Sequence, residues 1–214
     1  MRVEENSVLY NSLLLWGEEV SYHFLSLGTI FQICILKDKS NPKRVYLVAN
    51  THLHSRPSVP YLRLFQMALL ITHMERLVEQ YKKREGKEAC VLLCGDFNST
   101  PDTGLIQFVQ TGMIESNNID WQPWALNVPT KFVFPGIAMS HSLQLFNACG
   151  PTPFTHFAGH YTGTLDYIYC DTQHFKIHDV APMPALWEVS KETALPNTWF
   201  PSDHLPIVCT LNIV

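Results

Sequence analysis

The hydrophobic pattern of residues 61–85 predicts the longest helix of the chain. Its apolar positions recur at intervals of three and four residues, which is the spacing of one face of an α-helix. They are Tyr61, Leu64, Phe65, Ala68, Ile71, Leu77, Val78 and Tyr81. The basic triplet 82–84 suits the end of a helix, where cations complement the dipole, and Gly86 stops it. A nucleic-acid contact is the alternative interpretation of that triplet.

Short apolar runs rich in β-branched and aromatic residues predict strands before and after this helix. They cover residues 29–36, 44–50, 90–94 and 165–169, and the end of the chain after residue 204. The first two are separated by the polar turn 37–43, so we expect a hairpin. A short helix is expected over residues 103–109, before Gly112. Strands that alternate with helices predict an α/β fold.

In three other stretches the apolar residues recur without a clear helical or strand period. Residues 4–24 have a rough helical spacing that Gly17 weakens. Residues 113–142 are irregular, and a loop of this length is either functional or an insertion. Residues 171–198 contain three prolines and are also expected to be rich in loops.

Composition and charge narrow the class of protein. The chain has 214 residues, which fits one domain, and its hydrophobic fraction of 46% with 16% charged residues is typical of a globular protein. Its formal net charge is -4. A protein that grips long nucleic acid through its phosphates is basic, so a nucleic-acid substrate here is expected to be short, single-stranded or bound at a local metal site.

The six cysteines and the absence of a long apolar run bear on the compartment. None of the cysteines forms a CxxC pair and four lie in apolar, strand-like runs, which favours buried, reduced thiols in an intracellular compartment. No run of 18 apolar residues exists, so no membrane span is expected. Residues 1–5 carry acidic side chains, which signal and transit peptides lack.

Asp96 and Asn98 come directly after the apolar run 90–94 and Gly95. Their spacing of two predicts that both side chains leave the strand end on the same side. A carboxylate and an amide together can hold an attacking water, a phosphate oxygen or a hard cation. Taken by itself, the segment 95–101 also has the composition of a surface turn, which is the alternative interpretation.

His52 stands at the end of the strand predicted over residues 44–50, next to Thr51 and two residues before His54. An imidazole in that place can donate a hydrogen bond to a phosphate oxygen. The alternative is a structural histidine at a strand terminus.

Asp166, Asp203 and His204 are candidates near the end of the chain. Asp166 interrupts the apolar run 165–169, and a charge there needs a partner, either a backbone or tyrosine donor or a catalytic histidine. Asp203 and His204 come just before the predicted terminal strand. Strand ends hold site residues rigidly, so we expect these clusters to meet at one edge of a sheet.

These candidates predict metal-assisted attack of water on phosphorus. Carboxylates and an amide without a cysteine ligand set suit Mg²⁺, with Mn²⁺ as the second choice, better than Zn²⁺. The metal and the imidazoles would neutralise charge growing on the phosphoryl oxygens. A carboxylate behind His204 would orient the ring and favour its charged form.

Four motifs occur in the order Asn50-Thr-His-Leu53, Gly95-Asp-Phe-Asn-Ser99, Leu165-Asp-Tyr-Ile168 and Ser202-Asp-His204. With them the chain resembles the endonuclease/exonuclease/phosphatase superfamily, and within it the deadenylase branch of Ccr4-type nucleases, nocturnin, Angel proteins and 2',5'-phosphodiesterases. Residues 61–68, 95–101 and 194–204 look closest to the 2',5'-phosphodiesterases. The resemblance runs from about residue 29 to the end and implies part of a DNase I-like four-layer α/β sandwich, with two packed β-sheets flanked by helices.

The resemblance also implies roles for residues. Asp96 would activate or position the attacking water, Asn98 would help hold the phosphate, and His52 would contact the scissile phosphate. His204, oriented by Asp166, would stabilise the charge on the phosphorus, and Asp203 with Asp96 would lie at the metal. Pro57 and Tyr161 match positions that sandwich an adenine base; for Tyr161, a loop aromatic in contact with the core is the alternative.

Two departures from the family pattern are visible. Family domains begin with another half that supplies a metal-binding Glu, and residues 1–28 hold no such motif. We therefore expect residues 1–214 to be the C-terminal portion of one domain, with a large exposed apolar surface, low stability or aggregation. In addition, His156 stands where deadenylases commonly have Asn.

The function that follows from the resemblance is that of a Mg²⁺-dependent phosphodiesterase, or 3'-exoribonuclease, that releases AMP from adenylate-rich RNA or from 2',5'-oligoadenylate. The alternative is a catalytically incomplete fragment or an interaction module that lacks the upstream Glu. A phosphatase of a small phosphorylated ligand is a third possibility. The resemblance implies the mitochondrial matrix, and otherwise the cytoplasm is expected.

Overall fold

The computed structural model describes residue 24 and residues 28–122, 136–159 and 161–214. The elements, in chain order, are β1 (Phe31–Lys37), β2 (Arg44–His52), α3 (Pro60–Glu85), β3 (Glu88–Asp96), α4 (Gly104–Thr111), β4 (Met113–Ile114), the 3-10 turn η1 (Ile119–Trp121), β5 (Met139–Ser140), β6 (Leu145–Asn147), β7 (His156–Ala158), β8 (Tyr161–Gly163), β9 (Asp166–Asp171), β10 (Phe175–Val180), α5 (Leu186–Val189) and β11 (Cys209–Ile213). This is a mixed α/β architecture, as the sequence predicted.

A five-stranded sheet in the order β1-β2-β3-β9-β6 forms the centre of the fold. β1 and β2 are antiparallel, which confirms the predicted hairpin. β2 and β3 are parallel, and α3 makes the crossover that a parallel pair requires. β9 pairs antiparallel with β3, so the carboxyl ends of β2 and β3 meet the beginning of β9.

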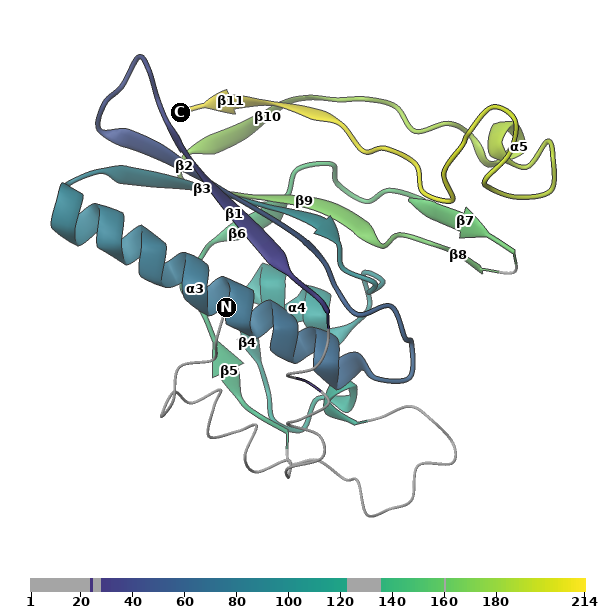
Figure 1. Cartoon of the computed structure of the whole chain (residues 1–214), viewed down its shortest axis with the longest axis horizontal. Helices are drawn as coiled ribbons and strands as arrows, with labels where there is room; N and C mark the ends of the chain where they lie inside the picture. Colours follow the sequence, from purple (N-terminus) through teal and green to yellow (C-terminus); the bar gives the residue numbers. More distant parts are fainter. Residues whose placement is uncertain (1–23, 25–27, 123–135, 160) are drawn as a thin grey trace.

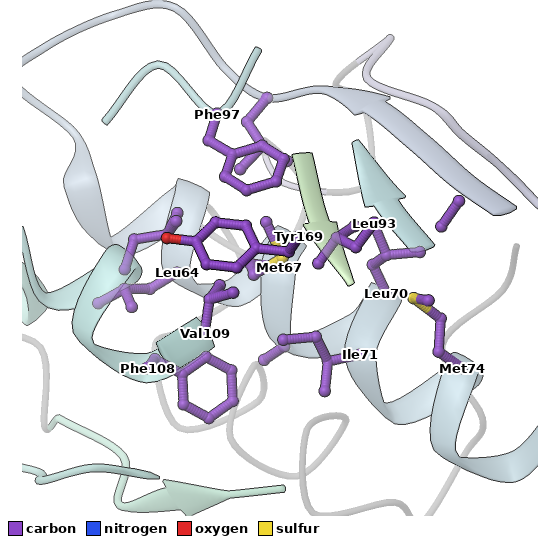
Figure 2. Packing of buried hydrophobic residues seen from close by; sticks show 14 of the residues in the cluster. Leu64, Met67, Leu70, Ile71, Met74, Leu93, Phe97, Phe108, Val109 and Tyr169 are labelled. Carbon is purple, nitrogen blue, oxygen red and sulfur yellow. The ribbon is translucent and has the colours of Figure 1, made fainter. Parts of the chain in front are cut away.

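The long helix α3 covers one face of this sheet and builds the main core. Pro60 begins the helix at a position where its missing N–H costs nothing, and Gly86 ends it in the left-handed conformation. Figure 2 shows how side chains of α3 and α4 point toward those of β3 and β9, with Tyr169 among them. The rings of Phe97 and Tyr169 stack with centroids 6.1 Å apart.

β10 and β11 pair antiparallel and form a second, smaller sheet. Figure 1 shows them as a separate layer on the side of the five-stranded sheet away from α3. Phe175 of β10 packs there in a cluster with Cys90 of β3 and Cys170 of β9. The chain therefore has a helical layer, a central sheet and a second sheet packed on it, which agrees with the expected two-sheet sandwich.

The structure corrects several local expectations. Residues 171–198 are not only loop, because β10 and the short helix α5 lie within them. Asp166 is the first residue of β9 and not a carboxylate within a strand that begins at Leu165. Four residues separate His204 from β11, so the pair 203–204 does not stand directly at the mouth of that strand. The rough helical spacing over residues 4–24, except for residue 24, and part of the irregular stretch 113–142 fall outside the described residues.

The thiols and the exposed apolar side chains can be compared with the expectations from the sequence. All six cysteines are free thiols, as expected, but Cys34 is exposed on β1 and not buried. Exposed apolar side chains occur on β1, β10 and β11, at Leu36, Ile177 and Ile213. Among the helices that the structure describes, none has both the length and the apolar character needed to cross a bilayer.

Candidate active site

Three predicted site residues lie in one row across the central sheet. His52, the last residue of β2, is the register partner of Asp96, the last residue of β3. Asp96 is in turn the partner of Asp166, the first residue of β9. Directly paired residues of neighbouring strands project from the same face of a sheet. Strand pairing therefore brings together side chains that are up to 114 positions apart in the sequence (166 minus 52).

Asp96 lies between two imidazoles. Its Oδ2 is 3.3 Å from Nε2 of His52 and 3.7 Å from Nε2 of His204. Burial raises the pKa of Asp96, the N–H of Asn98 lowers it, and the charge of Asp166 raises it again. The net effect is a raised pKa, which makes this carboxylate a better proton acceptor than an ordinary exposed aspartate.

Asp166 is the partner of His204, which is the catalytic alternative that the sequence left open. Nδ1 of His204 is 2.7 Å from Oδ2 of Asp166, so the ring turns Nε2 toward Asp96. Burial lowers the pKa of His204, but the hydrogen bond to Asp166 and the charges of Asp166, Asp96 and Asp203 outweigh it, and the net pKa is raised. The charged imidazolium is therefore favoured at this position.

Asn98 reaches the site by an unusual backbone conformation. The strand alternation stops at Asp96, because Asn98 has a φ of 47° in the left-handed region. Its N–H donates to Oδ1 of Asp96 at 2.8 Å, and its Nδ2 donates to the carbonyl of Leu53 at 2.9 Å. Asn98 thus fixes the Asp96 carboxylate and ties the end of β3 to the chain after β2.

Gly95 sets the close approach of β2 and β3 at the site. It has a φ of 142°, and a Cβ at this position would lie 1.9 Å from the carbonyl oxygen of Thr51. Only glycine fits such a position without moving one of the strands. The motif around Asp96 therefore includes a steric requirement in addition to its polar groups.

A cleft of about 530 Å³ lies over this row. All of the predicted site residues line it except Asp166, which lies behind His204: they are His52, Pro57, Asp96, Asn98, Tyr161, Asp203 and His204. Tyr161 of β8 is 45% exposed, and its ring centroid is 5.6 Å from that of His156. An aromatic ring partly open to a cleft is able to stack on a base.

Arg63 is a residue of this site that the pattern analysis missed. It is buried in α3, and its guanidinium donates to Oγ of Ser99 at 3.2 Å and to the carbonyls of Arg56 at 2.6 Å and His54 at 3.3 Å. Burial lowers its pKa, although nearby carboxylates oppose this. The signal in the sequence was a charge among the apolar positions of a helix, which requires an internal partner.

Thr155 is a second residue that the sequence did not suggest. Its buried hydroxyl accepts hydrogen bonds from the N–H groups of Leu165 and Asp166 at 2.9 and 3.0 Å. It therefore holds the beginning of β9, and with it the Asp166 carboxylate, in place. A lone threonine before a histidine gives no sequence signal for such a role.

Two groups of side chains are compact enough to hold a cation. One consists of Asp96, Asp166 and His204, and the other of His156, Asp203 and His204. In each group the donor atoms lie within 4.8 Å of one another. Both groups include imidazole, whereas Mg²⁺ takes oxygen ligands, so a Mg²⁺ ion would be held here by Asp96 together with water and substrate phosphate.

The chain is similar in sequence to curated proteins. A rat protein named 2',5'-phosphodiesterase 12 is 35% identical over 188 residues, which are 87% of this chain and 29% of that protein. A Ccr4 3'-5'-exoribonuclease subunit of Mycosarcoma maydis is 26% identical over 235 residues, covering 99% of this chain and 34% of the relative. The chain therefore spans about a third of the length of the curated relatives that it matches.

Solved structures show the same fold. ANGEL2, described as a 2',3'-cyclic phosphatase in complex with adenosine-2',3'-vanadate, matches with a TM-score of 0.70 at 20% identity, over 88% of this chain and 62% of that one. The human Nocturnin catalytic domain matches with a TM-score of 0.58 at 20% identity, over 88% and 54%. The model of the Endonuclease/Exonuclease/phosphatase family matches residues 14–204. The chain belongs to the endonuclease/exonuclease/phosphatase family.

Proposed function

We propose that this chain carries part of the active site of a metal-dependent phosphodiesterase that removes AMP from adenylate-rich RNA or from 2',5'-oligoadenylate. The observation that carries the proposal is the row of His52, Asp96 and Asp166 with His204 oriented above it. A carboxylate of raised pKa beside a charged imidazole fits an acid–base pair for hydrolysis at phosphorus.

The side chains divide the work as follows. Asp96 accepts the proton of a water that attacks phosphorus, the bond to the ribose oxygen of the preceding nucleotide breaks, and that oxygen takes up a proton from solvent to leave as a hydroxyl. His204 donates from Nε2 to a non-bridging oxygen and neutralises its charge, while Asp166 keeps the proton on Nδ1. His52, whose side chain is 70% exposed, donates to the same phosphate. A divalent cation, when bound, adds Lewis-acid polarisation of that phosphate.

The substrate contacts are proposed from the residues that line the cleft. Pro57 and Tyr161 both line it and are proposed to hold an adenine base between them. The net charge of -4 favours a short, single-stranded substrate over a long duplex.

Mg²⁺ is the proposed metal, with Mn²⁺ as the alternative. The mitochondrial matrix is the proposed location of the protein.

A second candidate is that the chain is catalytically incomplete and folds or acts only together with another part of the domain. It is favoured by the lining of the cleft, because no Glu side chain contributes to it among the described residues. The exposed apolar side chains on β1, β10 and β11 also favour a covering partner.

The test is AMP release from 2',5'- and 3',5'-linked oligoadenylates, with Mg²⁺, with Mn²⁺ or with EDTA. The Asp96→Ala variant should lose activity by at least about 100-fold, since general base catalysis contributes 10²- to 10⁴-fold. His178→Asn is a matched control, because His178 is exposed on β10 and outside the cleft. If the folded chain releases no AMP under any condition, the second candidate replaces the first.

A further inference from the structure

We propose that His156, Asp203 and His204 form a binding site for a transition-metal cation such as Zn²⁺, distinct from the cation at Asp96 that the proposed function requires. Each of the three side chains offers a donor atom within 4.8 Å of the other two. Two imidazoles and a carboxylate are a ligand set that suits Zn²⁺ and its neighbours in the transition series better than Mg²⁺.

The backbone holds the three ligands on one rigid unit. His156 and His204 are opposite each other in an isolated antiparallel bridge, so their side chains share one face. Flanking hydrogen bonds run from Phe157 N to Asp203 O at 3.1 Å and from Leu205 N to Thr155 O at 2.7 Å. The two imidazole rings meet edge to face, with centroids 4.7 Å apart.

The distances are close to those of a coordinated ion. Nε2 of His156 is 3.5 Å from Oδ2 of Asp203. Two ligands of a tetrahedral ion at about 2.1 Å lie about 3.4 Å apart, so this pair already has the required spacing. The Asp203 side chain is 51% exposed.

Two further features fit a metal ligand set. Nδ1 of His204 is held by Asp166, which leaves Nε2 to bind the ion, and this carboxylate–imidazole pair is the usual support of a metal-binding histidine. Nδ1 of His156 is buried and has no hydrogen-bond partner among the described residues, whereas Nε2 faces Asp203 and is the ring nitrogen that is available to an ion.

The expected site has three protein ligands and one open position. Because the cluster lines the cleft, the open position faces the substrate, as in catalytic rather than structural zinc sites. An ion bound there would occupy Nε2 of His204, the nitrogen that also faces Asp96. Binding of Zn²⁺ would therefore compete with the phosphate contact assigned to His204 above.

The experiment is titration of the full chain with Zn²⁺ by calorimetry and with Co²⁺ by visible absorption, in neutral buffer without phosphate. One ion per chain and the absorption of a tetrahedral Co²⁺ complex are expected. His156→Asn should weaken Zn²⁺ binding by at least about 10-fold, because even changes to the residues that support metal ligands cost 10- to 100-fold. His178→Asn should leave the affinity unchanged.

Two more variants keep the result interpretable. Asp203→Asn changes a half-exposed side chain and should weaken binding as His156→Asn does, with the fold of both variants checked by circular dichroism. Asp96→Ala should retain the Zn²⁺ affinity while losing hydrolysis. The proposal is overturned if Zn²⁺ binds equally well without His156, if it does not bind at all, or if Asp96→Ala and not His156→Asn removes it. None of these binding results depends on AMP release.

Discussion

Replacing Asp166 by Asn tests the link between the sheet and the charge state of His204. The change preserves the shape of the side chain but removes the carboxylate that lies 2.7 Å from Nδ1 of His204. That carboxylate also raises the pKa of Asp96, so one substitution acts on both members of the proposed acid–base pair. Asn leaves a carbonyl oxygen in place to accept the Nδ1 proton, but it carries no charge.

The size of the effect follows from the hydrogen bond. A bond to a charged group contributes about 1.5 to 3 kcal/mol and a neutral one about 0.5 to 1.5 kcal/mol. The difference of about 1 to 1.5 kcal/mol corresponds to a protonated-to-neutral ratio of His204 that is about 5- to 13-fold lower at the same pH. Both side chains are largely shielded, with 27% and 20% exposure, so solvent screening reduces this estimate only modestly.

The pH dependence of stability has a defined sign. The pKa of His204 is higher in the folded than in the unfolded state, so its protonation stabilises the fold at a pH below about 6.5, and this contribution is lost as the pH rises through the raised pKa. In the Asp166→Asn variant this stabilisation is absent, so the variant should lose less stability than the unsubstituted protein when the pH rises above about 6.5. In the hydrolysis assay the whole pH profile should move to lower pH, because the substitution lowers the pKa of Asp96 and of His204 together.

The assay is an NMR titration of the imidazole resonances, combined with urea denaturation at a series of pH values. The matched control is Asp171→Asn, because Asp171 holds Nδ1 of His174 at the same distance of 2.7 Å, outside the cleft. That control should leave the titration of His204 unaffected. An unchanged titration of His204 in the Asp166→Asn variant would refute the reasoning.

Three further predictions concern positions around the cleft. Arg63→Met should cost roughly 3 kcal/mol in urea denaturation, since it leaves several carbonyls without a donor, and Arg63→Lys should cost less because its ammonium replaces some of those bonds. Gly95→Ala should cost roughly 2 to 5 kcal/mol in the same measurement, through contact with Thr51 and backbone strain. Asp96→Asn should stabilise the fold at pH 7 by roughly 0.5 to 2 kcal/mol, because the raised pKa of Asp96 means that its ionised form destabilises the native state. The melting temperature of the unsubstituted protein should rise as the pH falls through the pKa of Asp96, and the variant should not show this rise.

The predictions that succeeded rest on local patterns. The helix over residues 61–85 became α3, and the hairpin of residues 29–36 and 44–50 became β1 and β2. The short helix expected over residues 103–109 became α4. Such elements follow from apolar periodicity and from the chemistry of proline and glycine at their ends, which are properties of neighbouring residues.

The failures have a physical reason as well. β10 has one buried residue at its start followed by mostly exposed ones, so it lacks the apolar alternation by which a strand is detected. Cys34 looked buried in an apolar run, but β1 lies at the edge of its sheet. The burial of a strand depends on the strands and helices that pack against it, and the local amino-acid sequence of the strand does not specify them.

The sequence alone determined the chemical inventory of this protein and its family. Motifs around His52, Asp96, Asp166 and His204 identified the catalytic candidates, because carboxylates and imidazoles at strand ends have a limited range of uses. The tertiary structure decided how they combine. Strand register placed His52, Asp96 and Asp166 in one row, while the bridge to His156 brought in His204 from the end of the chain. Pairing between distant strands is fixed only when the whole sheet forms, so the geometry of the cleft exists in the fold and not in any single segment.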